Sequence, residues 1–102
     1  LPTRSARTDD MDALVSYYAG NAHYTLRYDR AATDTAIYHY ERAVAQDPGF
    51  GEAYVALARA HIWRFWQFAE SGDRVPAQAA LERARALAQE QAETRLAEGL
   101  VP

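Results

Sequence analysis

Apolar residues recur along this chain at spacings of three and four, which is the pattern of amphipathic α-helices. No segment of the sequence alternates with a period of two, and β-branched residues are sparse. Residues 1–8 precede the first apolar stripe, and we expect them to form a flexible N-terminal segment. The remaining residues, 9–102, are predicted to form one all-α domain. Its helices are expected over about 9–28, 30–46, 51–68, 76–89 and 91–100.

Local signals mark several of the expected helix ends. The side chain of Asp29 can cap the second helix, because a short acidic side chain accepts hydrogen bonds from the first free backbone N–H groups. Pro48 disfavours the helical conformation at Asp47, and Gly49 allows a sharp turn. Pro76 suits the first turn of the fourth helix, where its missing N–H has no cost. These signals separate the apolar stripes into distinct helices.

The sequence also repeats itself over pairs of helices. Tyr-Glu-Arg-Ala-Val-Ala at 40–45 is matched by Leu-Glu-Arg-Ala-Arg-Ala at 81–86. A second match relates Ala53, Leu57 and Ala58 to Ala92, Leu96 and Ala97. Small residues recur where two helix backbones must approach closely, and larger residues fill the space beside them. In the first pair, Gly20 is the expected close-approach residue, and Tyr40 is an expected core residue.

This pattern resembles the tetratricopeptide repeat, a helix-turn-helix unit of about 34 residues. The motif of its first helix is matched by Tyr54, Leu57, Ala58 and His61, with histidine replacing an aromatic residue. The motif of its second helix is matched by Ala36, Tyr40, Ala43 and Pro48. The resemblance covers about residues 13–100. It implies antiparallel helix-turn-helix repeats, an α-solenoid fragment of about two and a half repeats, whose function is to bind protein.

The sequence departs from the family pattern at three places, and one is in the first unit, where Gly20 as the close-approach residue requires extra residues before the second helix. The loop around Ser71 and Gly72 is longer than in the family, and Gln89 stands where the second helix of a unit closes with proline. The stretch 17–60 also resembles a bacterial subset in which the repeats follow a kinase, cyclase or winged-helix regulator domain. That likeness, and the unusual first and last residues, imply an excised segment of a longer, cytoplasmic bacterial signalling protein.

Composition narrows the possible functions. The net charge is −3, and 11 basic residues, all arginine, are interleaved with 14 acidic ones, which argues against nucleic-acid binding. The absence of cysteine excludes disulfides, thiol catalysis and cysteine-bound zinc. No apolar run approaches the ~20 residues that span a bilayer, so we expect no membrane partner.

The sequence offers no sign of catalytic chemistry. His23, His39 and His61 lack the helical spacing, with a carboxylate neighbour, that a metal site needs. No serine lies in a G-x-S-x-G motif, and there is no glycine-rich phosphate loop. The acidic run at Asp9, Asp10 and Asp12 is expected to stabilise a helix N-terminus. We therefore expect no catalytic residue, no metal and no cofactor, and hence not an enzyme.

The aromatic segment 62–68 is the most distinctive candidate for binding. If Phe65 faces the core, Trp63 and Trp66 must point elsewhere, because consecutive helical positions are about 100° apart. Either they anchor a ligand, or the 69–75 loop or a neighbouring repeat covers them. In the family, peptides lie against the first helix of each unit. The corresponding positions in this sequence add four candidate residues to the two tryptophans. The candidate protein-binding residues are Glu52, Val55, Arg59, Ile62, Trp63 and Trp66.

The expected partner is another protein or peptide, or another domain of the same chain. The family's grip on a C-terminal carboxylate requires lysine, which this sequence lacks, so binding of chaperone tails is not expected. Two alternatives remain open. The segment could form a homodimer, or it could be a helical sensor that holds a small ligand among its aromatic residues, in which case an enclosed pocket with converging polar groups is expected.

Overall fold

The computed structural model describes residues 8–99, with side chains to residue 96, and this part of the chain is all-helical. The expected N-terminal segment 1–8 falls almost wholly outside the described residues, as does the end of the last expected helix at Leu100. Within the described range there are four α-helices, one short 3-10 helix and no strand. They are α1 (Met11–Tyr24), α2 (Arg30–Gln46), α3 (Gly51–Phe68), the 3-10 helix η1 (Ser71–Asp73) and α4 (Arg74–Gly99).

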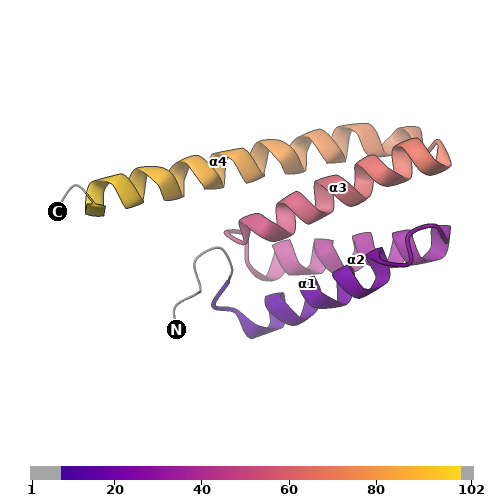
Figure 1. Ribbon diagram of the computed structural model, residues 1–102, viewed down its shortest axis with the longest axis horizontal. Coiled ribbons are helices and arrows are strands. Elements are labelled where there is room, and N and C mark those ends of the chain that lie inside the picture. Colours follow the sequence, from indigo (N-terminus) through magenta and orange to yellow (C-terminus); the bar gives the residue numbers. More distant parts are fainter. Residues whose placement is uncertain (1–7, 100–102) are drawn as a thin grey trace.

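The helices pack in the order in which they occur along the chain. Helix α1 packs on α2, α2 packs on α3, and α3 packs on α4, each pair antiparallel (Figure 1). The C-terminal half of α4 extends beyond the other helices, so that the molecule measures 50 × 25 × 19 Å. A helix of 26 residues is about 39 Å long, which accounts for most of the longest dimension.

The core between α1 and α2 is built on one close approach. Tyr40 of α2 is fully buried against the backbone of Gly20 in α1, where an added Cβ would lie 2.5 Å from the ring carbon Cε1. The Tyr40 hydroxyl donates a hydrogen bond to Asn21 Oδ1 at 2.6 Å, and burial raises the pKa of Tyr40 to about 12. The expectation that Gly20 is a close-approach residue and Tyr40 a core residue is confirmed.

A second set of buried residues joins α1, α2 and the start of α3. Phe50, immediately before α3, is fully buried, and its ring lies 5.0 Å from that of Tyr17. Three alanines complete this cluster, one from each helix: Ala13, Ala43 and Ala53. Small side chains let the three helices approach the phenylalanine ring from different sides. The sequence pattern did not single out Phe50, because it lies in the turn and outside any apolar stripe.

Aspartates cap the first two helices. Asp10 accepts hydrogen bonds from the backbone N–H groups of Asp12 (2.9 Å) and Ala13 (3.1 Å), and Asp29 accepts one from Ala31 at 3.2 Å. These contacts satisfy N–H groups that have no partner within the helix. The cap predicted at Asp29 is confirmed, and α2 and α3 have the bounds expected from the sequence.

The first helix is shorter than expected. It ends at Tyr24, whereas the sequence predicts a helix to about residue 28. The carbonyl of Arg27 accepts hydrogen bonds from the Thr33 hydroxyl (2.8 Å) and from Trp63 Nε1 (3.0 Å). These long-range contacts stabilise a turn that directs the chain into α2, and apolar periodicity carries no information about them.

The two helices expected over 76–89 and 91–100 form a single helix, α4. The sequence has no proline or glycine from Ala77 to Glu98, and glutamine and glutamate at 89–91 are good helix formers, so nothing ends the helix there. Pro76 lies in the first turn of α4, where backbone N–H groups have no helical partner. Residues 88–96 are all exposed, because they extend past the start of α3.

Candidate protein-interaction groove

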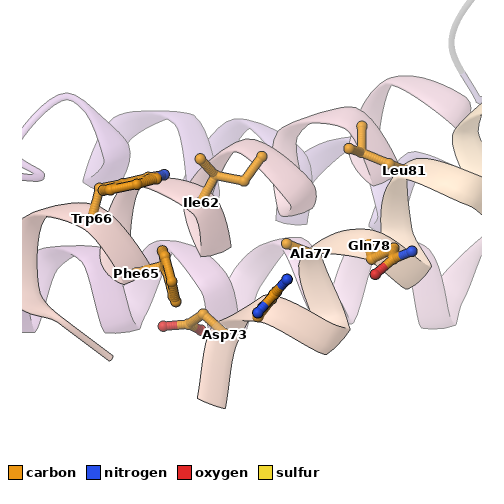
Figure 2. A pocket seen from close by; sticks show the side chains of 8 residues that line it. Ile62, Phe65, Trp66, Asp73, Ala77, Gln78 and Leu81 are labelled. Carbon is orange, nitrogen blue, oxygen red and sulfur yellow. The ribbon is translucent and has the colours of Figure 1, made fainter. Parts of the chain in front are cut away.

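A shallow apolar groove runs between α3 and α4. Its larger part is a cavity of about 470 Å³ that is open to solvent. Figure 2 shows Ile62, Phe65 and Trp66 of α3 on one side and Ala77, Gln78 and Leu81 of α4 on the other. A smaller hollow of about 160 Å³ lies farther along the same two helices. It is lined by Gly51, Glu52, Val55, Ala84, Leu87, Ala88 and Gln91.

Large apolar side chains of α3 remain exposed along this groove. Trp66 is 76% exposed, Val55 51% and Ile62 40%. Their spacing of seven and four residues puts all three on one face of the helix. The opposite wall, on α4, includes the alanines 77, 84 and 88, which are too small to cover these side chains. Exposed apolar residues that share a groove indicate a binding surface more strongly than the same residues scattered singly.

Four of the six residues proposed from the sequence lie along this groove. Ile62 and Trp66 line the larger cavity, and Glu52 and Val55 line the smaller hollow. Phe65, a possible core residue by its position, is half-buried and lines the cavity beside Trp66, with the two rings edge to face at 5.3 Å. The 69–75 segment leaves Trp66 uncovered, so this segment does not account for the exposed ring.

Arg59 and Trp63 lie on a different side of α3, the side that faces α1. The Arg59 guanidinium lies over the Tyr24 ring at 4.5 Å. The Trp63 ring contacts Tyr28 edge to face at 5.1 Å, and the Arg27 guanidinium lies over it at 4.9 Å. Together with the hydrogen bond to the Arg27 carbonyl, these contacts make Trp63 part of the packing between α3 and the α1–α2 connection. The structure therefore separates the two tryptophans.

A buried ionic cluster supports the base of the groove. Asp73, 1% exposed, accepts hydrogen bonds from Arg64 Nε and Nη2, both at 2.8 Å, and from His61 Nδ1 at 2.6 Å. Arg64 also donates to Asp34 Oδ1 of α2 at 2.8 Å. The cluster thus ties the start of α4 to α3 and α2. Sequence reasoning missed this cluster, and the signal nearest to it is Arg64, an arginine within an aromatic segment.

The charges in this cluster are fixed by their contacts. Burial alone would raise the pKa of Asp73, but the hydrogen bonds from Arg64 and His61 outweigh it and hold the pKa below its ordinary value. The same contact with Asp73 raises the pKa of Arg64 despite its partial burial. Within the described residues, His61 Nε2 is buried without a hydrogen-bond partner. Both carboxylate oxygens of Asp73 are engaged by Arg64, and one of them also by His61.

The other two histidines stack on each other where α1 and α2 meet. The rings of His23 and His39 lie 5.5 Å apart and are inclined by 15°. Burial, the nearby His23 and Arg42 all lower the pKa of His39. Among residues 8–96 no group of three or more potential metal ligands occurs. Protonation of His39 would place a positive ring against the ring of His23, so this contact bears on stability.

The stacked pair makes folding stability depend on pH. Because the folded-state pKa of His39 is lowered, the unfolded chain binds more protons, and stability should fall as pH decreases below about 6.5. We expect His39→Gln to remove this part of the slope, on the order of a few tenths of a kcal/mol because the ring is partly solvated. Thermal unfolding between pH 7 and pH 5 measures it. His23→Gln should reduce the slope in part, because it removes one of the groups that lower the pKa of His39, and an unchanged slope in both variants would contradict the assignment.

Comparison with protein-family models, with curated proteins and with solved structures finds no match to this chain. None of the helices within residues 8–99 combines the length and apolar character needed to cross a membrane. Geometry alone therefore defines the class, which is an all-α protein with an open apolar groove between its last two helices.

Proposed function

We propose that this chain is a protein-interaction module built from tetratricopeptide-like helical hairpins, and that it belongs to a longer bacterial regulatory protein. Its binding surface is the groove between α3 and α4. The observation that carries the proposal is Trp66, which is 76% exposed at the edge of an apolar cavity bordered by Ile62 and Leu81. Tryptophan is one of the residue types in which binding hot spots are enriched.

Recognition at this groove relies on shape and on burial of apolar area. A helix or peptide of the partner places an apolar side chain in the cavity and covers the Trp66 ring. Arg74 and Gln78 at the edge of the cavity supply polar contacts that orient the partner. The shallow hollow beside Val55 continues the contact along α3. No covalent step is involved.

The lining of the groove favours a protein partner over a small ligand. The cavity volume is within the usual range for small-molecule sites, which also place a few converging polar groups around the ligand. Here the carboxylate of Asp73 is already occupied by Arg64 and His61. The remaining lining is apolar except for Arg74 and Gln78, and the cavity is open. This surface suits an apolar side chain presented by another polypeptide.

Site-specific photo-crosslinking tests the proposal. A photoreactive residue at position 78, at the edge of the cavity, is expected to form adducts with polypeptide when the protein is irradiated in its host cells. Trp66→Ala should reduce the yield by about 30-fold, because truncation of a hot-spot residue costs about 2 kcal/mol. Val15, which is exposed on α1, provides the control position. Equal yields at positions 15 and 78, or a yield indifferent to Trp66, would contradict the proposal.

A further inference from the structure

Charge divides α4 into two halves of opposite sign. Residues 74–89 carry three arginines and one glutamate, which leaves a net charge of +2. Residues 90–99 carry three glutamates and one arginine, which leaves a net charge of −2. The positive half borders the groove, whereas the negative half extends beyond α3 into solvent. An antiparallel pair of such helices would place each positive half beside a negative one.

The projecting half of α4 also carries an apolar stripe. Ala92 and Leu96 are exposed, Leu96 by 64%. They follow Leu81 and Ala88 at intervals of seven and four residues, so all four share one face of the helix. Leu81 and Ala88 line the groove. The groove face of α4 therefore continues past the start of α3 as an uncovered apolar ridge.

The sequence of this ridge matches that of a helix that is buried against its neighbours. Ala92 and Leu96 match Ala53 and Leu57 of α3, both of which are buried against neighbouring helices. Because α4 is one unbroken helix, its projecting half cannot reach the groove of its own molecule. A second copy of the chain can bring an identical segment to that groove.

We propose that two copies of this chain pair their α4 helices antiparallel, so that the projecting half of each lies in the α3–α4 groove of the other. The inference rests on the proposed function, since it names a second copy as the partner of that groove. Both contacts are equivalent, as a two-fold interface requires. The charges of the two halves of α4 are complementary in such a pair.

The spacing along α4 supports this pairing. With the two-fold axis near Ala88, Leu96 of one copy lies about 12 Å from the axis, and Leu81 of the other lies at a similar distance on the same side. Leu96 then reaches the larger cavity, beside Ile62 and Trp66. At the crossing itself the side chains are alanines 84, 88 and 92, which permit close approach of the helices.

The oligomeric state of the 102-residue chain tests the inference. Light scattering coupled to size exclusion, from about 1 to 200 μM, should show a dimer. Leu96→Glu, in the exposed projecting half, should give a folded monomer, and so should Ile62→Glu in the groove. Val75→Glu is the matched control, because Val75 is also on α4 and is 74% exposed but lies outside the groove. It should remain a dimer.

Mixing the two charged variants sharpens the test. The groove of the Leu96→Glu variant and the ridge of the Ile62→Glu variant are both intact, so a mixture should form a heterodimer through one of the two contacts. A monomeric wild type at 200 μM, or a dimer unaffected by Leu96→Glu, would overturn the inference. If the chain is monomeric but still gives Trp66-dependent adducts with other proteins at position 78, the groove's function stands and only self-pairing fails.

Discussion

Asp73→Ala should lower the free energy of unfolding by about 3–5 kcal/mol, the usual cost of removing one partner from a buried ion pair. Without the carboxylate, the Nε and Nη2 groups of Arg64 and Nδ1 of His61 lose the acceptor that they share. Small domains are stable by only about 5–15 kcal/mol in total, so this loss is a large fraction. Urea denaturation followed by circular dichroism measures it directly.

Asp34 provides the matched control for this prediction. It also binds Arg64 at 2.8 Å, but its side chain is half-exposed, so Asp34→Ala should cost less than about 1 kcal/mol. The lowered pKa of Asp73 also predicts that the stability of the fold decreases in acid. Because its folded-state pKa is lowered, its contribution is present above pH 4 and is lost as pH falls below that value. Equal losses for the Asp73 and Asp34 variants would contradict the assignment of Asp73 as the buried centre of this cluster.

The sequence was most informative where an element depends on neighbouring residues. Helices α2 and α3 have local signals at their ends, the Asp29 cap and the Pro48–Gly49 turn, and both have the expected bounds. The sequence was least informative where contacts between residues far apart in the chain determine the local structure. The turn after α1 depends on Thr33 and Trp63, which bind the Arg27 carbonyl from six and 36 residues away. Helix α4 is continuous because no helix-breaking residue interrupts it. The repeat match instead predicted two separate helices there.

In the candidate site, too, local spacing was predictable from the sequence, whereas contacts between distant residues were not. Periodicity predicts only that Trp63 and Trp66 do not share the direction of Phe65, and it makes both of them candidate binding residues. It cannot say which face another helix covers, since that depends on the crossing of α3 with its neighbours. The structure places Trp63 against the α1–α2 connection and leaves Trp66 beside an open cavity. The ionic cluster around Asp73 lay in a polar segment that the sequence marked only as a loop.

The close approach of α1 and α2 depends on the absence of a side chain at Gly20. A Cβ at position 20 would lie 2.5, 2.6 and 3.0 Å from three carbons of the Tyr40 ring, closer than atoms can approach without a shift. That ring cannot swing aside, because it is fully buried and its hydroxyl is bound to Asn21. Gly20→Ala should therefore destabilise the fold by about 1–3 kcal/mol through overpacking.

Helix propensity predicts the opposite sign, which makes this substitution a sharp test. Glycine-to-alanine changes within helices commonly stabilise by up to about 1 kcal/mol. Gly51→Ala is the matched control, since a Cβ there meets only Leu87 at an ordinary 4.0 Å, and it should be neutral or stabilising. Combining Gly20→Ala with Tyr40→Leu should recover part of the loss and give a measurable coupling energy. If Gly20→Ala stabilises as Gly51→Ala does, α1 and α2 do not approach as closely as described, and the register of the first helical hairpin must change.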